Sequence, residues 1–404
     1  MSKMFEIEIS RPGGIGSATV MLPATPWELC DALDMARITD KRDIYTVEML
    51  NCELPYLQNY IHESANLYEL NRLAQRLSEL DDWQLHCFEG MVKMDAEKGA
   101  TAIPVERLIN FTHSMTDCQI AYEAHDDASL GRFYVENGFP VIPENLPEIL
   151  YDILDYESIG RKARMNEGGV FTSKGYVVQN GEIAQTYRGG GAVPLEKPAH
   201  TIMLEVCRGY FNDPAYDNDQ SEFPLLPADD GILDRAIAQV DAASIEECSL
   251  RAVDCIVPKL TELISDSLYA ADGDCYGAVN ELARQLKNLS DSGRLVTYKA
   301  MMEAAPQDIT LEEAIDLAGQ TESFALLRGL DDASGYAERE LRRMMAQEHD
   351  TGLERFVNLY GYGLFLMEKD QIAETAYGLL EPLDCRTVEQ CLGRDTPVQG
   401  MEMK

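Results

Sequence analysis

Asp126-Asp127-Ala128-Ser129 returns unchanged as Asp331-Asp332-Ala333-Ser334, 205 residues further along the chain. Four shorter similarities occur in the same order, with offsets of 203 to 209 residues. They pair Leu22-Pro23-Ala24 with Leu226-Pro227-Ala228, Cys52-x2-Pro55 with Cys255-x2-Pro258, Asn71-x-Leu73-Ala74 with Asn280-x-Leu282-Ala283, and Thr172-x2-Gly175 with Thr375-x2-Gly378. Five matches in one order indicate that a unit of roughly 180 to 200 residues has been duplicated.

A segment rich in glycine and proline separates the two copies. Residues 187–198 read YRGGGAVPLEKP and have no hydrophobic period, which is typical of a linker. Beyond it, residues 202–206 repeat the strand-like pattern that begins at residues 5–9. We therefore expect a first repeat over 1–182, a linker over 183–199, a second repeat over 200–385, and a C-terminal tail over 386–404 that frays.

Each repeat combines strand and helix patterns. In the first repeat the residue periods predict strands over 5–9, 18–22 and 44–50, helices over 27–36, 67–77 and 146–154, and a hairpin over 169–172 and 176–179. Asp81 or Asp82 can cap a further helix, Pro104 suits a helix start, and Thr310 begins a capping box in the second repeat. The predicted class is α+β: a tandem duplication of an elongated unit with small mixed α/β subdomains and a helical middle.

The charge of the chain is strongly negative. Its 404 residues include 70 acidic and 34 basic ones, a formal net charge of -36, whereas 45% of residues are hydrophobic, as in a folded protein. Such a balance argues against direct binding to nucleic acid or to an anionic membrane. The sequence has no apolar run of about 18 residues, and its ten cysteines form no CxxC pair. We expect a cytoplasmic protein with reduced thiols.

The motifs of enzymes and metal sites are missing from the sequence. No HExxH, GxSxG or GxxxxGK[ST] motif occurs. The best metal constellation is His113, Asp117, Cys118 and His125, but Gly319, Ser323 and Phe324 stand at the counterparts of the first three in the second copy. Residues 13–16 (GGIG) lead into a strand and lack a phosphate-binding lysine, so they are interpreted as a β-turn. We expect no catalytic residue, no metal and no cofactor.

The acidic residues are concentrated in folded parts of the sequence. Residues 126–160 contain eight acids and one base, and residues 205–274 contain sixteen acids and four bases. Hydrophobic residues are interleaved with them at structural spacing, so a fixed framework should carry the carboxylates. The surface is either an ordinary solvated face or an array of anions offered to a basic groove. A charge of -36 equals that on about 60 Å of duplex DNA, on the order of 18 base pairs.

The first repeat resembles the ArdA antirestriction family, which is carried on mobile genetic elements. The similarity rests on the strand near Phe5 and on five later segments: 68–73 (YELNRL) with 78–80 (SEL), 133–136 (FYVE), 146–148 (LPE), 155–161 (DYESIGR) and 169–176 (GVFTSKGY). It implies an elongated acidic protein of three small subdomains that mimics duplex DNA, forms two-fold dimers and inhibits type I restriction-modification enzymes without a cofactor. This chain is twice as long, so it is either a single-chain pseudo-dimer or a homodimer whose second copy has diverged.

The resulting hypothesis is a non-enzymatic inhibitor that blocks the DNA-binding cleft of a type I restriction-modification complex or of another DNA-binding defence protein. The proposed DNA-mimic surface consists of acids expected to be exposed: Glu63, Glu69, Asp81, Asp82, Asp126, Asp127, Glu144, Glu148, Asp152, Asp155, Glu157, Asp213, Asp217, Asp219, Asp229, Asp230, Asp272, Asp274, Asp331 and Asp332. An acidic interaction module that inhibits a different basic protein is the alternative. An enzyme, the third reading, would require activity that depends on His113 or Cys118.

Overall fold

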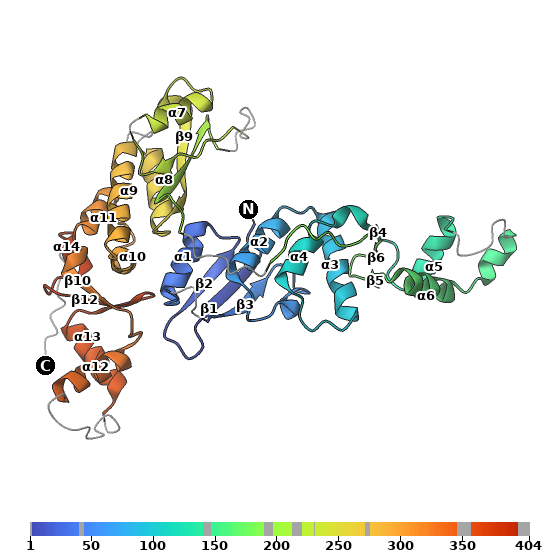
Figure 1. The fold of residues 1–404 in the computed structure, drawn as a ribbon, viewed down its shortest axis with the longest axis horizontal. Helices are drawn as coiled ribbons and strands as arrows, with labels where there is room; N and C mark the ends of the chain where they lie inside the picture. The colour runs from blue at the N-terminus through green and yellow to red at the C-terminus, as the bar shows by residue number, and fades with distance from the viewer. Residues whose placement is uncertain are drawn as a thin grey trace, which may run out of the picture. The chain divides into compact units, whose positions relative to one another are not determined.

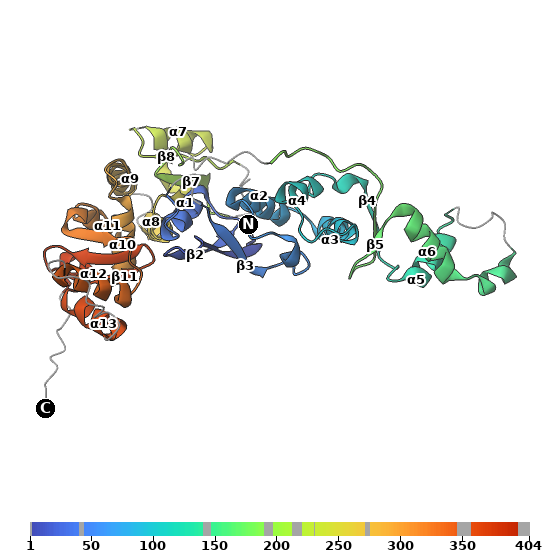
Figure 2. The same ribbon diagram turned by 60° about the horizontal axis from the view of Figure 1, so that its bottom comes forward.

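The structure is a computed structural model that describes residues 2–39, 44–139, 147–189, 197–211, 220–229, 231–270, 275–345 and 357–394, and it does not describe the side chains of residues 148 and 149. Helices and small three-stranded sheets are both present, which confirms the predicted α+β class (Figures 1 and 2). The chain divides into two compact units. Unit 1 comprises Met1–Glu8, Thr19–Ala24 and Tyr45–Val193; unit 2 comprises Ile9–Ala18, Thr25–Ile44 and Pro194–Lys404. The proposed repeat boundaries stay a prediction.

The first sheet has the order β2-β1-β3, and its strands are β1 (Phe5–Ser10), β2 (Ser17–Leu22) and β3 (Thr46–Cys52). Alternate residues of β1 and β2 are buried, because successive side chains of a strand point to opposite faces. Between these strands the Gly14 amide donates to the Arg11 carbonyl at 2.9 Å, and Gly13 has a φ of 64°. A β-turn is therefore present at residues 11–14, with Pro12 and Gly13 at its centre, and it overlaps the predicted turn over 13–16 only at Gly13 and Gly14.

A layer of helices follows in unit 1: η1 (Gln58–Tyr60), α2 (Leu67–Ser78), α3 (Asp82–Glu97) and α4 (Val105–Phe111). The leucines of α2 at positions 67, 70, 73 and 77 are buried, as the helical period predicts. Asp81 caps α3 in a capping box, and Pro104 precedes α4. Asn71 of α2 fixes the end of β2, since its side chain accepts from the Ala24 amide at 2.7 Å and donates to the Ala24 carbonyl at 3.0 Å.

The second sheet of unit 1, in the order β4-β6-β5, is covered on both faces. It comprises β4 (Cys118–Ala121), which η2 (Met115–Asp117) precedes, β5 (Val170–Phe171) and β6 (Tyr176–Gln179). Strands β5 and β6 pair antiparallel, so the predicted hairpin is confirmed. Val177 packs against Gly90 of α3, whereas Tyr176 and Val178 join the apolar cluster with Leu130 of α5 (Asp127–Glu136) and Ala163 of α6 (Tyr156–Glu167).

Helices α5 and α6 pack closely because glycines meet at their crossing (Figure 1). A Cβ atom on Gly160 would lie 1.8 Å from the Asp127 carbonyl oxygen, and one on Gly131 would lie 1.9 Å from the Tyr156 carbonyl oxygen. Residues 146–154, predicted as a helix, contain the 3-10 helix η3 (Glu148–Ile153) in their described part. Part of the predicted linker is packed in unit 1, since Tyr187 exchanges backbone hydrogen bonds of 2.7 and 2.8 Å with the buried Asn110 side chain.

Unit 2 contains the third sheet, in the order β8-β7-β9, and the helices around it. The elements are α1 (Pro26–Met35), β7 (Ile202–Arg208), β8 (Leu225–Leu226), α7 (Ile232–Gln239), η4 (Ile245–Glu247), β9 (Cys248–Cys255) and α8 (Leu260–Ala270). Strand β7 pairs antiparallel with both neighbours. Helix α1 is the predicted helix over 27–36, and its Trp27 belongs to the core of this unit.

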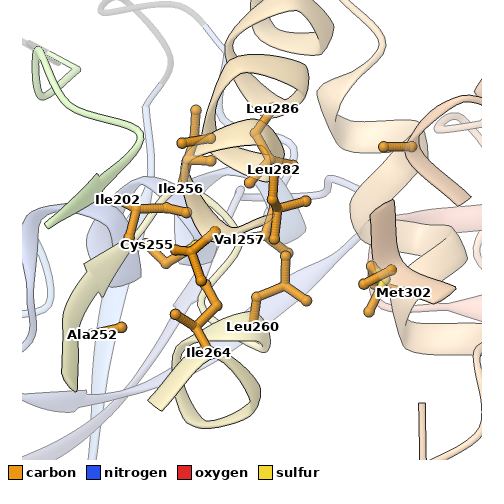
Figure 3. Packing of buried hydrophobic residues seen from close by; sticks show 14 of the residues in the cluster. Ile202, Ala252, Cys255, Ile256, Val257, Leu260, Ile264, Leu282, Leu286 and Met302 are labelled. Atoms are coloured by element: carbon orange, nitrogen blue, oxygen red, sulfur yellow. The ribbon is translucent and has the colours of Figure 1, made fainter. Parts of the chain in front are cut away.

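Three helices complete that core: α9 (Tyr276–Asp291), α10 (Leu295–Ala304) and α11 (Leu311–Ala318). Figures 1 and 2 both show them side by side, and Figure 3 shows side chains of β7, β9, α8 and α9 pointing toward one another. Asn280 of α9 holds the end of β8 through hydrogen bonds of 2.9 Å to the amide and the carbonyl of Ala228. Thr310 caps α11 in the predicted capping box.

The last sheet has the order β10-β12-β11 and is built from β10 (Phe324–Leu327), which η5 (Thr321–Ser323) precedes, β11 (Ala373–Thr375) and β12 (Gly378–Pro382). Leu379 packs against α12 (Ala333–Met345) and α13 (Leu359–Lys369), while Leu380 belongs to the larger core.

The C-terminal segment is folded as far as residue 394, so the expectation that it frays is wrong there. Thr387 caps α14 (Val388–Cys391), and Val388 is buried in the core of unit 2. Arg394 pairs with Glu313 at 2.7 Å and also with Asp308. One buried valine and one ion-paired arginine hold this segment, and neither of them produces an apolar period along the sequence.

Candidate protein-interaction surface

Two of the predicted acidic residues cap the helices of the α5–α6 pair. Asp126 accepts hydrogen bonds from the Ser129 amide and hydroxyl, both at 2.7 Å. Asp155 accepts from the Ser158 hydroxyl at 2.6 Å and from its amide at 3.0 Å. These bonds lower the pKa of both carboxyls. Both side chains are exposed, so each helix start presents a full negative charge in a fixed position.

Asp127 and Glu157 lie beside these caps and are paired with arginines. Asp127 is half-buried and accepts two hydrogen bonds from Arg164, at 2.8 and 3.1 Å. Those bonds, with the charge of Arg164 and the nearby Arg161, lower the pKa of Asp127. Glu157 is exposed and forms an ion pair with Arg161. The expectation that Asp127 is exposed is therefore wrong, because the carboxylate joins α5 to α6.

Some of the remaining predicted acids of unit 1 are exposed, and others are held by a neighbouring side chain. Asp81 is exposed and caps α3 by accepting from the Gln84 amide at 2.8 Å. Glu69 is half-buried, contrary to expectation, and accepts from the Tyr187 hydroxyl at 3.2 Å. Three others are exposed and have no ion pair within 4.0 Å among the residues that the structure describes: Glu63, Asp82 and Asp152. These carboxylates are the most available for an external cation.

In unit 2 the repeated Asp-Asp-Ala-Ser sequence again begins a helix. Asp332 is exposed and accepts from the Gly335 amide at 2.8 Å at the start of α12. Asp331 is half-buried, contrary to expectation, because it forms an ion pair with Arg37. The first aspartate caps the helix in the first half of the chain and the second aspartate does so in the second half, so the two caps differ by one residue in register. Asp229 is exposed.

Eight other predicted sites are not placed by the structure. Glu144, Asp213, Asp217, Asp219, Asp230, Asp272 and Asp274 lie outside the described residues, as does the side chain of Glu148.

Sequence reasoning missed exposed acids that lie one helical turn apart. Glu262 and Asp266 share the exposed face of α8, opposite its buried leucines and isoleucine, and Glu312 and Asp316 do the same on α11. Like charges at this spacing destabilise a helix by about 0.2–0.5 kcal/mol. The apolar period of each helix could have revealed them, because the apolar residues define the buried face and these acids lie on the opposite, solvent-exposed face.

The candidate metal constellation is not assembled. In the described parts of the chain, no group of three or more histidine, cysteine, aspartate or glutamate side chains is arranged to hold a metal ion. His113 is half-buried, and its Nε2 atom has no hydrogen-bond partner among the residues whose positions the structure gives. Burial and the nearby Arg76 and Arg72 lower its pKa. Across the same described residues, no helix combines the length and the apolar character that crossing a membrane requires.

The family model described as antirestriction protein (ArdA) matches residues 13–178. This range runs from the turn after β1 to strand β6, and it includes the capped α5–α6 pair. No curated protein matches the chain. Residues 13–178 are therefore similar to the ArdA antirestriction family.

Proposed function

We propose that this protein is a non-enzymatic DNA mimic that blocks the DNA-binding cleft of type I restriction-modification enzymes in the cytoplasm. The observation that carries the proposal is the pair of exposed, helix-capping carboxylates Asp126 and Asp155. Hydrogen bonds hold each group ionised and fixed, as phosphates are fixed along a duplex. Arginines and lysines of a DNA-binding groove would pair with such anions and release counterions, as they do with phosphates.

Charge and composition support the same proposal. With a net charge of -36, the chain would resemble DNA in its density of negative charge. A DNA-binding groove can recognise such charge without contacts to the edges of the bases. Within the described parts of the chain, exposed acids without an ion pair occur on α3 and η3 of unit 1 and on α8 and α11 of unit 2. The like-charged pairs on α8 and α11 cost helix stability, and a surface that serves only as a solvated face has no need of them.

We further propose that the chain arose by duplication. The two halves have similar element orders, and in each half an asparagine brackets the residue after Leu-Pro: Asn71 holds Ala24, and Asn280 holds Ala228. Each half also contains two three-stranded sheets, the second of which is covered by a helix pair. A tandem of two such units would give one chain the two copies that a homodimer of single-length family members has.

Restriction protection in cells tests the proposal. The first variant combines D126N, D152N, D155N and E157Q; asparagine caps helices as well as aspartate does, so α5 and α6 should stay folded. The second combines E262Q, D266N, E312Q and D316N and removes the same charge from unit 2. We expect at least one variant to lose protection steeply. If the combined eight-residue variant, folded by circular dichroism, protects as well as the parent, DNA mimicry through these surfaces is wrong.

Competition separates a DNA mimic from an acidic module that binds elsewhere on a basic protein. A mimic should be displaced from the purified enzyme by added duplex DNA, and its affinity should fall as salt rises. Simultaneous binding of DNA and this protein to one enzyme would favour the alternative.

A further inference from the structure

Helix α1 lies in the first half of the sequence, within the ArdA-matched range, yet it belongs to unit 2. Its Trp27 is 3% exposed and packs in the core formed by the second half. The Trp27 indole nitrogen donates to the His200 carbonyl at 3.0 Å, and its backbone amide donates to the Asp254 carboxylate at 3.3 Å. The first turn of α1 is therefore held by both apolar and polar contacts.

The middle of α1 is held by a buried lysine. The Lys299 side chain is 1% exposed, and its Nζ atom lies 2.7 Å from Asp31 Oδ1 and 2.9 Å from Asp34 Oδ2. The Tyr377 hydroxyl donates to the Asp31 carboxylate at 2.9 Å. Burial lowers the pKa of Lys299, but the two carboxylates more than offset this, so its pKa lies above the ordinary value. An ammonium group so enclosed needs both acids of α1.

The end of α1 is fixed by Arg37, which has a φ of 58°. Its Nε atom donates to the Arg328 carbonyl at 2.7 Å, one Nη atom donates to the Ala376 carbonyl at 3.1 Å, and the other pairs with Asp331. Arg328 in turn donates to the Asp34 carbonyl at 2.8 Å. The second half thus satisfies the carbonyl end of the helix as well as its side chains.

The equivalent helix of the second half does not have these features. Helix α7 ends as α1 does, with Asp241 at a φ of 57° where α1 has Arg37. At the same offset, Gly231 replaces Trp27 and the exposed Arg235 replaces Asp31. An arginine facing Lys299 would repel it, so the contacts select α1 and exclude α7.

We propose that the second half of the chain, residues 197–394, carries a binding groove for an amphipathic helix with two carboxylates on one turn, and that α1 of the same chain is its occupant. The occupied groove joins the two halves non-covalently, so the halves remain together when the connection between them is cut. This inference stands apart from the proposed function, because it concerns assembly and is measured without a restriction enzyme.

Cleavage of the full chain tests the inference. A protease recognition sequence is placed within residues 190–196, and the purified protein is cut and passed through size exclusion with light scattering. The two fragments are expected to elute together at the mass of the intact chain, 45.1 kDa. Separation of the fragments at micromolar concentration would overturn the inference. If the intact chain is a dimer, the cut protein should keep the same doubled mass, and loss of half of each chain from it would overturn the inference.

Variants locate the contact. K299M and W27A should each raise the concentration at which the cut halves separate by at least tenfold, whereas K287M on the exposed face of α9 should leave it unchanged. Circular dichroism of each uncut variant checks that it is folded. If a variant does not fold, the cleaved parent alone decides. Fragments of folded K299M and W27A that hold together as tightly as the parent's would show that α1 is not the joining element.

Discussion

The carboxylate of Asp127 and the guanidinium of Arg164 form a two-pronged ion pair that links the first turn of α5 to α6. Asp126, its neighbour in the repeated Asp-Asp-Ala-Ser sequence, caps α5 and faces solvent. Adjacent acids of one motif therefore have different roles: Asp127 contributes to stability, and Asp126 is available to a partner. Whether an acidic residue of this protein is available to another protein therefore depends on the ion pairs and hydrogen bonds that it forms in the structure.

Replacing Asp127 by asparagine should lower stability and leave restriction protection nearly unchanged. The ion pair is partly exposed, so we expect a loss of about 1 kcal/mol in the free energy of unfolding. Urea denaturation of D127N, of an Arg164→Met variant and of the double variant measures the coupling between the two side chains. D152N, at an exposed site without an ion pair, is the matched control and should unfold like the parent. Full additivity of the two changes would contradict the assigned ion pair.

The buried asparagines should matter more than an exposed one on the same helix. N280A removes both hydrogen bonds to Ala228. The amide and the carbonyl of Ala228 are then unsatisfied, which should lower the free energy of unfolding by about 1–3 kcal/mol. N71A should have a similar effect in the first half. N288A, on the exposed face of α9, should change the unfolding midpoint little. Equal unfolding midpoints for N280A and N288A would show that the hydrogen bonds between Asn280 and Ala228 do not contribute to stability.

Stability should fall in acid through Asp95. Burial raises the pKa of its carboxyl, but the hydrogen bonds and charge of Arg107 outweigh burial and lower it below the ordinary value of 3.8. A carboxyl with a lowered pKa stabilises the folded state above its unfolded pKa, and this contribution is lost as pH falls through the folded value. Thermal unfolding between pH 7 and pH 2.5 should show a steeper decline below about pH 4 for the parent than for D95N. Parallel curves would contradict this assignment.

Thiol reactivity should separate one cysteine from the other nine. Cys385 is exposed, whereas the others are buried or half-buried. Burial, with the charge of Asp34 adding to it, raises the pKa of Cys30 to about 11, and burial raises that of Cys255 to about 12. Titration of the folded protein with a thiol reagent at pH 8 should give one fast-reacting group. C385S should lose that group and C255S should keep it; several fast groups in C385S would contradict the burial of the rest.

Local patterns in the sequence identified most elements of the first half. The alternation of apolar residues located the strand at Phe5, and the period of α2 located its buried leucines. These features depend on residues a few positions apart, which is why a single sequence reveals them. The same locality explains the error at the C-terminus, where Val388 and Arg394 are held by residues far away in the chain.

The sequence by itself determined the total charge, the strand and helix periods, and the similarity of residues 13–178 to the ArdA family. Only the tertiary structure decided which carboxylates are free, because pairs such as Asp127 with Arg164 and Asp331 with Arg37 join residues 37 and 294 positions apart. It also decided that α1 packs with the second half, through Lys299, 265 positions beyond Asp34. Charge is a sum over the composition, whereas exposure and pairing depend on which distant segments the folded core brings together.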